Sequence, residues 1–221
     1  MKKLFITLLI IIGIGKLTYA QQKTRSNFEF GISGGYNFSY TVSNAGFYNY
    51  YGDYYGSYSS SIKSGYNVGV SGEYYFNETW SLKAKVIYDQ KGWADGSLTD
   101  DKGTEFDYVD YRLNYVTVPI MANIHFGRRS NWYLNFGPYI GFLTTAKANV
   151  GGDNIDLKPL FHSVDGGLAA GLGIKIPVSN SSSVFFEYDS QTGLSNVARP
   201  GASDTGSLQL LRGSLNVGLS F

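Results

Sequence analysis

The chain has 221 residues, of which 18 are basic and 17 acidic, and this balance lacks the excess of positive charge typical of nucleic-acid-binding proteins. It contains no cysteine, which excludes a disulfide framework and thiol chemistry. Aromatic residues make up 16% of the chain, and the counts of 19 Tyr and 28 Gly are typical of strands and turns. The composition therefore favours an all-β protein without a nucleic-acid partner.

The N-terminus has the parts of a secretory signal peptide. Lys2 and Lys3 precede an apolar run over residues 4–15, and a small-residue ending follows at Ala20. The run is shorter than the roughly 20 apolar residues of a membrane helix, which disfavours the alternative of an uncleaved helical anchor. We predict a signal peptide over residues 1–20, cleaved after Ala20, and one mature domain over residues 21–221.

Beyond residue 27 apolar and polar residues alternate with a period of two, which predicts strands with two unlike faces. In the first strand Phe28, Phe30 and Ile32 share one face, and Glu29 and Ser33 lie on the other. The chain has eight such segments in all, over residues 28–38, 66–76, 80–88, 116–126, 132–142, 168–176, 184–188 and 211–221. The pattern predicts eight antiparallel strands.

The connections between these segments alternate in length. Three are short, over residues 77–79, 127–131 and 178–183, and four are long, over residues 41–65, 92–107, 146–163 and 193–207. Outer-membrane barrels have short periplasmic turns and long external loops. The pattern therefore predicts a barrel with both termini on the periplasmic side.

Alternation alone also fits a soluble, lipocalin-like barrel, so the direction of the apolar face needs further evidence. Aromatic residues mark both ends of the apolar band, as in the girdles of membrane barrels: Phe76, Trp80, Phe126 and Trp132 at the short turns, and Tyr40, Tyr66, Tyr88 and Phe142 near the long loops. The other face carries charges that suit a paired lumen: Glu29, Glu73, Lys83, Lys85, Asp89, Lys175, Glu187 and Arg212. Both features favour an outward apolar face.

The last strand carries a further feature of exported barrels. Leu215, Val217, Leu219 and Phe221 alternate up to the final residue and resemble the C-terminal signal that the outer-membrane assembly machinery recognises. Because an open sheet edge is not tolerated in lipid, the last strand must pair with the first. We predict an all-β fold, an eight-stranded antiparallel up-and-down transmembrane β-barrel whose interior is filled by side chains, which disfavours a general porin.

The chain resembles the PorT-like outer-membrane β-barrel proteins, among the OmpA/OmpX-like small barrels. The resemblance is carried by YVTVPIM at residues 115–121, FGPYIG at 136–141, VDGGLAAGLG at 164–173 and GLSN at 193–196, although Thr117 stands where relatives often have an acidic residue. It implies the barrel architecture, and a founding member's link to protein secretion makes secretion-system proteins possible partners. It implies no catalytic residue and no cofactor.

We next consider whether any residues indicate a catalytic site or a nucleotide-binding loop. His125 lies beside a short turn, and His162 precedes Ser163 and Asp165, but neighbours in sequence do not make a catalytic triad. The glycines at 166, 167, 171 and 173 do not match a nucleotide-binding loop. Pro119 and Pro138 indicate irregular points within strands, because proline cannot donate to the β ladder.

Two of the long loops have unusual compositions. The first is rich in tyrosine, typical of adaptable recognition loops, and its candidate recognition residues are Tyr48, Tyr50, Tyr51, Tyr54, Tyr55 and Tyr58. The alternative without specific recognition is that these rings extend the aromatic rim or form a flexible hairpin. The second loop is acidic, with Asp95, Asp100, Asp101, Glu105, Asp107 and Asp110. It could hold a divalent cation bridging lipopolysaccharide, but it matches no EF-hand, so we assign no metal.

Taken together, the sequence predicts a non-enzymatic outer-membrane barrel of a Gram-negative bacterium, surrounded by outer-membrane lipid and lipopolysaccharide. Its role is predicted as structural or as surface recognition. The alternative is an accessory component of protein secretion, and a lipid-modifying enzyme is the least favoured reading.

Overall fold

The computed structural model describes residues 27–43, 49–51, 54–56, 61–99, 104–128, 130–199 and 207–221. The predicted signal peptide and its cleavage site at Ala20 lie outside them. No helix in the described part of the chain has the length and hydropathy to cross a membrane. The elements described are β1 (Phe28–Ser43), β2 (Asn49–Tyr51), β3 (Tyr54–Gly56), β4 (Lys63–Tyr75), β5 (Trp80–Thr99), β6 (Glu105–Phe126), β7 (Trp132–Val150), β8 (Asp153–Asp156), the 3-10 helix η1 (Lys158–Leu160), β9 (Val164–Pro177), β10 (Ser183–Gly193) and β11 (Leu208–Ser220).

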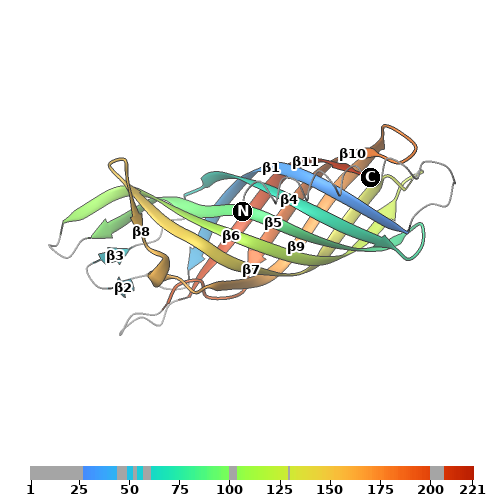
Figure 1. The fold of residues 1–221 in the computed structure, drawn as a ribbon. Coiled ribbons are helices and arrows are strands. Elements are labelled where there is room, and N and C mark those ends of the chain that lie inside the picture. The colour runs from blue at the N-terminus through green and yellow to red at the C-terminus, as the bar shows by residue number, and fades with distance from the viewer. Residues whose placement is uncertain are drawn as a thin grey trace, which may run out of the picture.

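Eight of these strands close into a barrel (Figure 1). They pair antiparallel in the circular order β1, β4, β5, β6, β7, β9, β10 and β11, and β11 pairs again with β1, where Tyr36 lies opposite Leu215. Closure gives each strand two neighbours, so no edge of the ring presents unpaired backbone groups to lipid. The predicted eight-stranded up-and-down barrel is confirmed.

The outward face of the ring is apolar between two aromatic belts. Ile32 is 47% exposed and Leu215 59% exposed, although both are large apolar side chains. At the end with the short turns the exposed rings are Phe76, Trp80, Phe126 and Trp132, and at the opposite end they include Tyr66 and Phe142. The apolar face therefore points outward, as a lipid-facing barrel requires.

The strands at the other end are longer than the sequence pattern predicted. β5 continues to Thr99, β6 begins at Glu105 and β7 continues to Val150, so much of two predicted loops is strand. We call this region, with β2, β3 and β8, the extended end; Figure 1 shows β2, β3 and β8 there, opposite the C-terminus. The predicted loops at residues 92–107 and 146–163 were therefore too long.

A reversal of polarity explains why the pattern failed there. Within the apolar band most inward residues are polar, but beyond it Tyr111 and Leu113 are buried while Arg112 between them is exposed. β7 also changes phase, because its register with β6 shifts between Asn114 and Tyr115. A sequence pattern that requires an apolar outward face therefore ends each strand where the polarity of the two faces reverses.

The buried apolar residues at the extended end form one cluster, which we call the apolar cap. The rings of Trp93 and Tyr111 are stacked with centroids 4.5 Å apart, and Phe161 packs edge-on against Trp93 at 6.1 Å. The Tyr111 hydroxyl donates to the Ser97 carbonyl at 2.6 Å, and burial raises the pKa of Tyr111 above its ordinary value. The cap consists of Trp93, Leu98, Val109, Tyr111, Leu113, Tyr115, Leu143, Ala146, Ala148, Leu157, Leu160, Phe161, Val197, Ala198, Leu208 and Leu210.

The two strand prolines interrupt the ladder without shifting it. The β5–β6 pairing is absent between Ala84/Ile120 and Ile87/Thr117, on either side of Pro119, and keeps the same register. The β6–β7 pairing is likewise interrupted around Pro138 and resumes in register. The predicted irregular points are therefore local gaps in the ladder and not bulges.

Candidate functional site

The interior of the barrel is crossed by ion pairs. β5 and β10 are opposite one another in the ring, and Lys85 on β5 binds both Glu187 and, at 2.9 Å, Asp189 on β10. Lys175 on β9 likewise reaches Glu73 on the opposite strand β4 at 2.8 Å. These contacts join facing walls, so charged side chains occupy the middle of the lumen.

The network continues toward the extended end. The Arg212 guanidinium lies between two acids, with Nη1 2.8 Å from Asp189 Oδ1 and Nη2 3.0 Å from Asp89 Oδ2. Asn37 Nδ2 donates to Asp89 Oδ1 at 2.8 Å. Each of the eight lumen charges that the sequence predicted takes part in an ion pair of this kind, so the interior is paired as expected: Glu29, Glu73, Lys83, Lys85, Asp89, Lys175, Glu187 and Arg212.

His125 belongs to this network near the short turns. Its Nε2 lies 2.8 Å from Glu73 Oε1 and 3.0 Å from Ser81 Oγ, and Ser81 Oγ donates to the same Glu73 oxygen at 2.6 Å. In a catalytic triad the acid and the hydroxyl contact different ring nitrogens, so that one orients the ring and the other is activated. Here the Glu73 carboxylate and the Ser81 hydroxyl both contact His125 Nε2. These contacts hold the three side chains in place inside the lumen.

The second histidine is not assembled with the residues near it in sequence. His162 is exposed, whereas the Asp165 carboxylate is fully buried inside the barrel. Asp165 Oδ2 lies 3.2 Å from Lys91 Nζ and accepts from the Tyr139 hydroxyl at 2.9 Å. His162 and Asp165, which are neighbours in sequence, therefore lie in different environments.

Asp165 is where the four sequence motifs meet, at the junction between the lumen and the apolar cap. Its Oδ1 accepts from Ser195 Oγ at 2.9 Å, and Ser195 Oγ in turn accepts from the Gly166 backbone N–H at 2.9 Å. Lys91 Nζ lies over the rings of Tyr115, at 5.2 Å, and Tyr139, at 4.7 Å. The motifs that carry the family resemblance thus build one buried structural junction.

Lys91 was not singled out from the sequence. It continues the inward alternation of Lys83, Lys85 and Asp89 along β5, and this was the signal available. It was missed because it lies next to Gly92, where the long loop was expected to begin.

The tyrosine-rich segment is placed at the extended end. Tyr50 and Tyr51 lie in β2, Tyr54 and Tyr55 lie in β3, and the two strands pair as a hairpin. Tyr48 and Tyr58 are outside the described residues. β3 pairs with β5 through Tyr55 opposite Thr99 and Gly56 opposite Leu98, so the hairpin continues the sheet of the extended end.

Four of the six acidic residues of the second loop lie in the described part of the chain: Asp95, Glu105, Asp107 and Asp110. Asp100 and Asp101 are outside the described residues, and Asp110 forms an ion pair with Lys63. Within the described ranges no group of three or more His, Asp or Glu side chains is arranged to hold a metal ion. The described acids of this loop therefore form no cluster suited to a divalent cation.

A closed antiparallel ring, an apolar outward band between aromatic belts and a paired polar lumen together define an integral outer-membrane β-barrel. The sequence model of the outer membrane protein beta-barrel domain family matches residues 19–199, and the chain belongs to this family. It therefore resides in the outer membrane of a Gram-negative bacterium, in contact with its lipid. Since short turns of such barrels face the periplasm, the extended end is extracellular.

The chain is similar to several solved structures at low sequence identity. Neisserial surface protein A is 15% identical with a TM-score of 0.50, over 88% of this chain and 96% of that one. Ail of Yersinia pestis, bound to the heparin analogue sucrose octasulfate, is 16% identical with a TM-score of 0.44, over 88% and 99% of the chains. OprG of Pseudomonas aeruginosa is 11% identical with a TM-score of 0.46, over 87% and 95%. A search of curated proteins found no match.

Proposed function

We propose that the chain is a non-enzymatic surface-recognition protein whose binding element is the β2–β3 hairpin. The single observation that carries this proposal is the continuous extracellular sheet formed by β2, β3 and the outer parts of β5, β6 and β7 with β8. A recognition segment is most effective when a rigid scaffold presents it, because less conformational entropy is then lost on binding. The apolar cap packs against this sheet and supplies that rigidity.

The residues of the hairpin suit contact with a macromolecule. Tyr50 and Tyr51 lie opposite Tyr55 and Tyr54 in its register, so four tyrosines stand in two cross-strand pairs. Tyrosine offers a large contact area with few rotatable bonds, and its hydroxyl adds hydrogen bonding. A lumen crossed by ion pairs favours this role over passage of solutes.

The inference of a non-enzymatic role is supported by the two histidines. His125 contacts Glu73 and Ser81 through one ring nitrogen, and His162 is apart from the Asp165 carboxylate. The partner inferred for biogenesis is the outer-membrane assembly machinery, which would recognise the C-terminal signal of the chain. Leu215, Val217, Leu219 and Phe221 are all exposed on one face of the last strand, where such machinery could reach them before insertion.

The test is photo-crosslinking in living cells. A photoreactive amino acid replaces Tyr51 or Tyr55 in the hairpin, or Glu78 or Arg128 in the periplasmic turns, with lipid-facing Val68 as the control position. The recognition proposal predicts crosslinks to an extracellular macromolecule from the hairpin positions alone. Crosslinks to secretion-system proteins from Glu78 or Arg128, with only lipid captured at the hairpin, would instead establish the secretion alternative suggested by the PorT-like resemblance.

A further inference from the structure

The outward face of the extended end carries two cations side by side. Arg112 on β6 and Lys147 on β7 are register partners, and both are exposed between buried neighbours. Like charges directly opposite on neighbouring strands repel each other and destabilise a sheet. An anion bound between the two cations would relieve this repulsion.

The described residues provide no salt bridge to either cation. Lys158 of η1 is a third cation on the same part of β7, because its Nζ donates to the Thr144 carbonyl at 2.9 Å. Asp156 is the register partner of Lys147 on β8, but its Oδ1 accepts from the Lys158 backbone N–H at 2.9 Å. Arg112, Lys147 and Lys158 form what we call the basic patch, and none of the three is in a salt bridge within the described ranges.

The height of the basic patch places it at the membrane surface. Val116 on β6 and Phe142 on β7 lie at the outer edge of the apolar band, and the cations lie four and five residues beyond them. At about 3.3 Å per residue along tilted strands, the patch lies on the order of 10 Å above the apolar band, at the depth of lipid headgroups. Arg112 also interacts electrostatically with Tyr88 of the upper aromatic belt.

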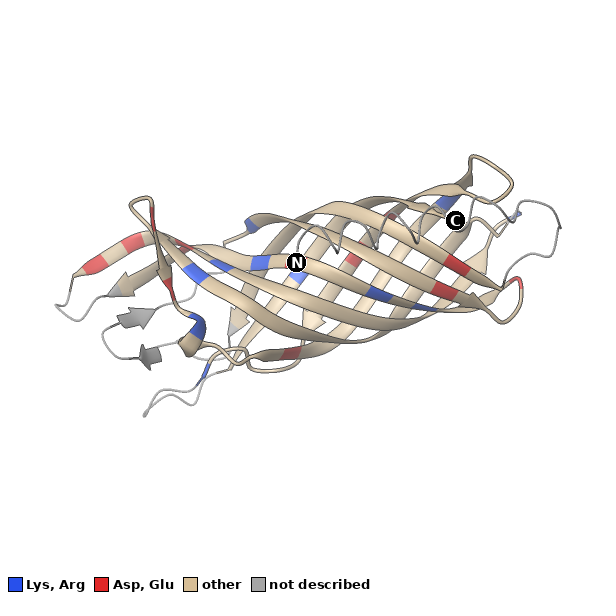
Figure 2. Cartoon of the chain, in the orientation of Figure 1, with Lys and Arg blue, Asp and Glu red and all other residues tan. Residues whose placement is uncertain are grey.

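The charges farther out have the opposite sign. Glu105 and Asp107 at the tip of β6 and Asp153 at the start of β8 are exposed, and the described parts of these tips carry no basic residue. Figure 2 shows the basic positions of β6, β7 and η1 between the barrel and the acidic end of β6. Acidic tips repel a polyanion that approaches from outside, so the favoured anion is one already in the membrane surface.

We propose that the basic patch binds the phosphate groups of lipopolysaccharide in the outer leaflet. Arginine and lysine make charge-assisted hydrogen bonds with phosphate, and the planar guanidinium of Arg112 suits two phosphate oxygens at once. The bound phosphate compensates the repulsion within the Arg112–Lys147 pair. Although η1 contacts β2, the variants at Arg112 on β6 and Lys147 on β7 leave the β2–β3 hairpin unchanged, so each proposal can fail without the other.

The test uses full-length mature protein refolded in detergent without lipid. Bisphosphorylated lipid A is titrated, and its binding is followed by the rise in the temperature at which the folded band is lost on a gel. The double variant R112Q/K147Q is expected to need about tenfold more lipid A for half of the effect than the wild type. R128Q, which removes an exposed cation from a periplasmic turn, is the matched control and should titrate like the wild type.

The variants also separate binding from a structural role. Without lipid, R112Q/K147Q should be at least as thermostable as the wild type, because repulsion has been removed; a loss of stability there would overturn the proposal. An unchanged lipid A titration in the double variant would overturn it as well. Equal protection by dephosphorylated lipid A, or by inorganic phosphate, would exclude a lipid phosphate site, whereas protection by bisphosphorylated lipid A alone supports it.

Discussion

Lys91 Nζ lies 3.2 Å from Asp165 Oδ2, and both side chains have no exposed surface. Asp165 also accepts hydrogen bonds from Tyr139 and Ser195, so one carboxylate joins β5, β7, β9 and the segment after β10. Loss of one partner from a buried pair leaves an uncompensated charge, and this costs more than the pair itself contributes. The junction is therefore a sensitive point of the barrel.

We predict that Asp165→Asn lowers the free energy of unfolding by about 3–5 kcal/mol, because the buried Lys91 would lose its ion-pair partner. The double variant K91M/D165N should lose less than the sum of the two single variants, since it removes the orphaned charge. Urea titration of the refolded protein in detergent measures both, and E78Q, at an exposed acid in a short turn, serves as the control. Additive losses in the double variant would contradict a coupled pair.

The apolar cap should unfold without the barrel. Trp93→Ala removes the ring that stacks on Tyr111 and contacts Phe161, at a cost of about 3–5 kcal/mol by analogy with other buried tryptophans. We expect protease added outside cells to cleave the extended end of this variant while the membrane-embedded part keeps its heat-dependent gel migration. Tyr108→Ala, at a residue 82% exposed, should leave cleavage unchanged. Equal resistance of W93A and the wild type would argue against the cap as the stabilising element.

Close packing of neighbouring strands should make Gly137 intolerant of a larger side chain. A Cβ at Gly137 would lie 2.1 Å from the Ile120 carbonyl oxygen and 2.9 Å from the Met121 Cα, so backbone would have to move. At Gly166 the added atom would meet only the Tyr139 carbonyl oxygen, at 3.8 Å. We predict that G137A reduces the amount of folded barrel in outer membranes, whereas G166A assembles normally. Similar amounts of both, quantified by unboiled gel samples, would show that β6 and β7 can separate freely.

Export should remove the first 20 residues. Lys2, Lys3 and the small residue Ala20 predict cleavage that leaves Gln21 as the N-terminus. Intact-mass measurement of protein from outer membranes should give the mass of residues 21–221. Ala20→Trp should delay processing, because the peptidase requires a small residue there. A full-length chain in the wild-type membrane would revive the helical anchor alternative.

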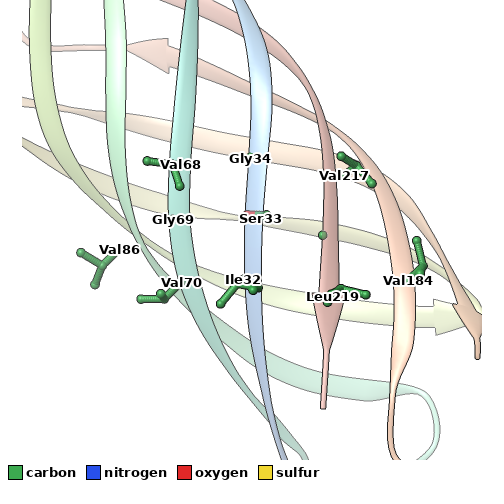
Figure 3. Close-up of a pocket in the computed structure, with 11 residues that line it drawn as sticks. Ile32, Ser33, Gly34, Val68, Gly69, Val70, Val86, Val184, Val217 and Leu219 are labelled. Atoms are coloured by element: carbon green, nitrogen blue, oxygen red, sulfur yellow. The ribbon is translucent and has the colours of Figure 1, made fainter. Parts of the chain in front are cut away.

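The lipid-facing surface retains a shallow hollow over β1, around Gly34 and between Val68 and Val217 (Figure 3). It has a volume of about 800 Å³ and is lined almost wholly by aliphatic side chains. Because it lies within the apolar band, acyl chains of the surrounding lipid fill such a surface without specific recognition.

The sequence alone determined the transmembrane barrel, because lipid imposes a strict outward apolar face with a period of two. The same alternation located the eight charges of the lumen on the inner face, including Arg212 and Glu187. It also gave the aromatic belts and the last strand that ends at Phe221. These features depend on each residue's place along its own strand, which sequence spacing records directly.

Only the tertiary structure decided which of these residues meet. The pairing of Lys85 with Asp189 across the lumen depends on ring order and strand register, and the junction at Asp165 joins four separate motifs. The extended end was missed because outside the membrane water reverses the preferred faces, so Tyr111 turns inward and Arg112 outward. Alternation reveals two unlike faces in both regions, but the solvent beyond the strand decides which face is buried.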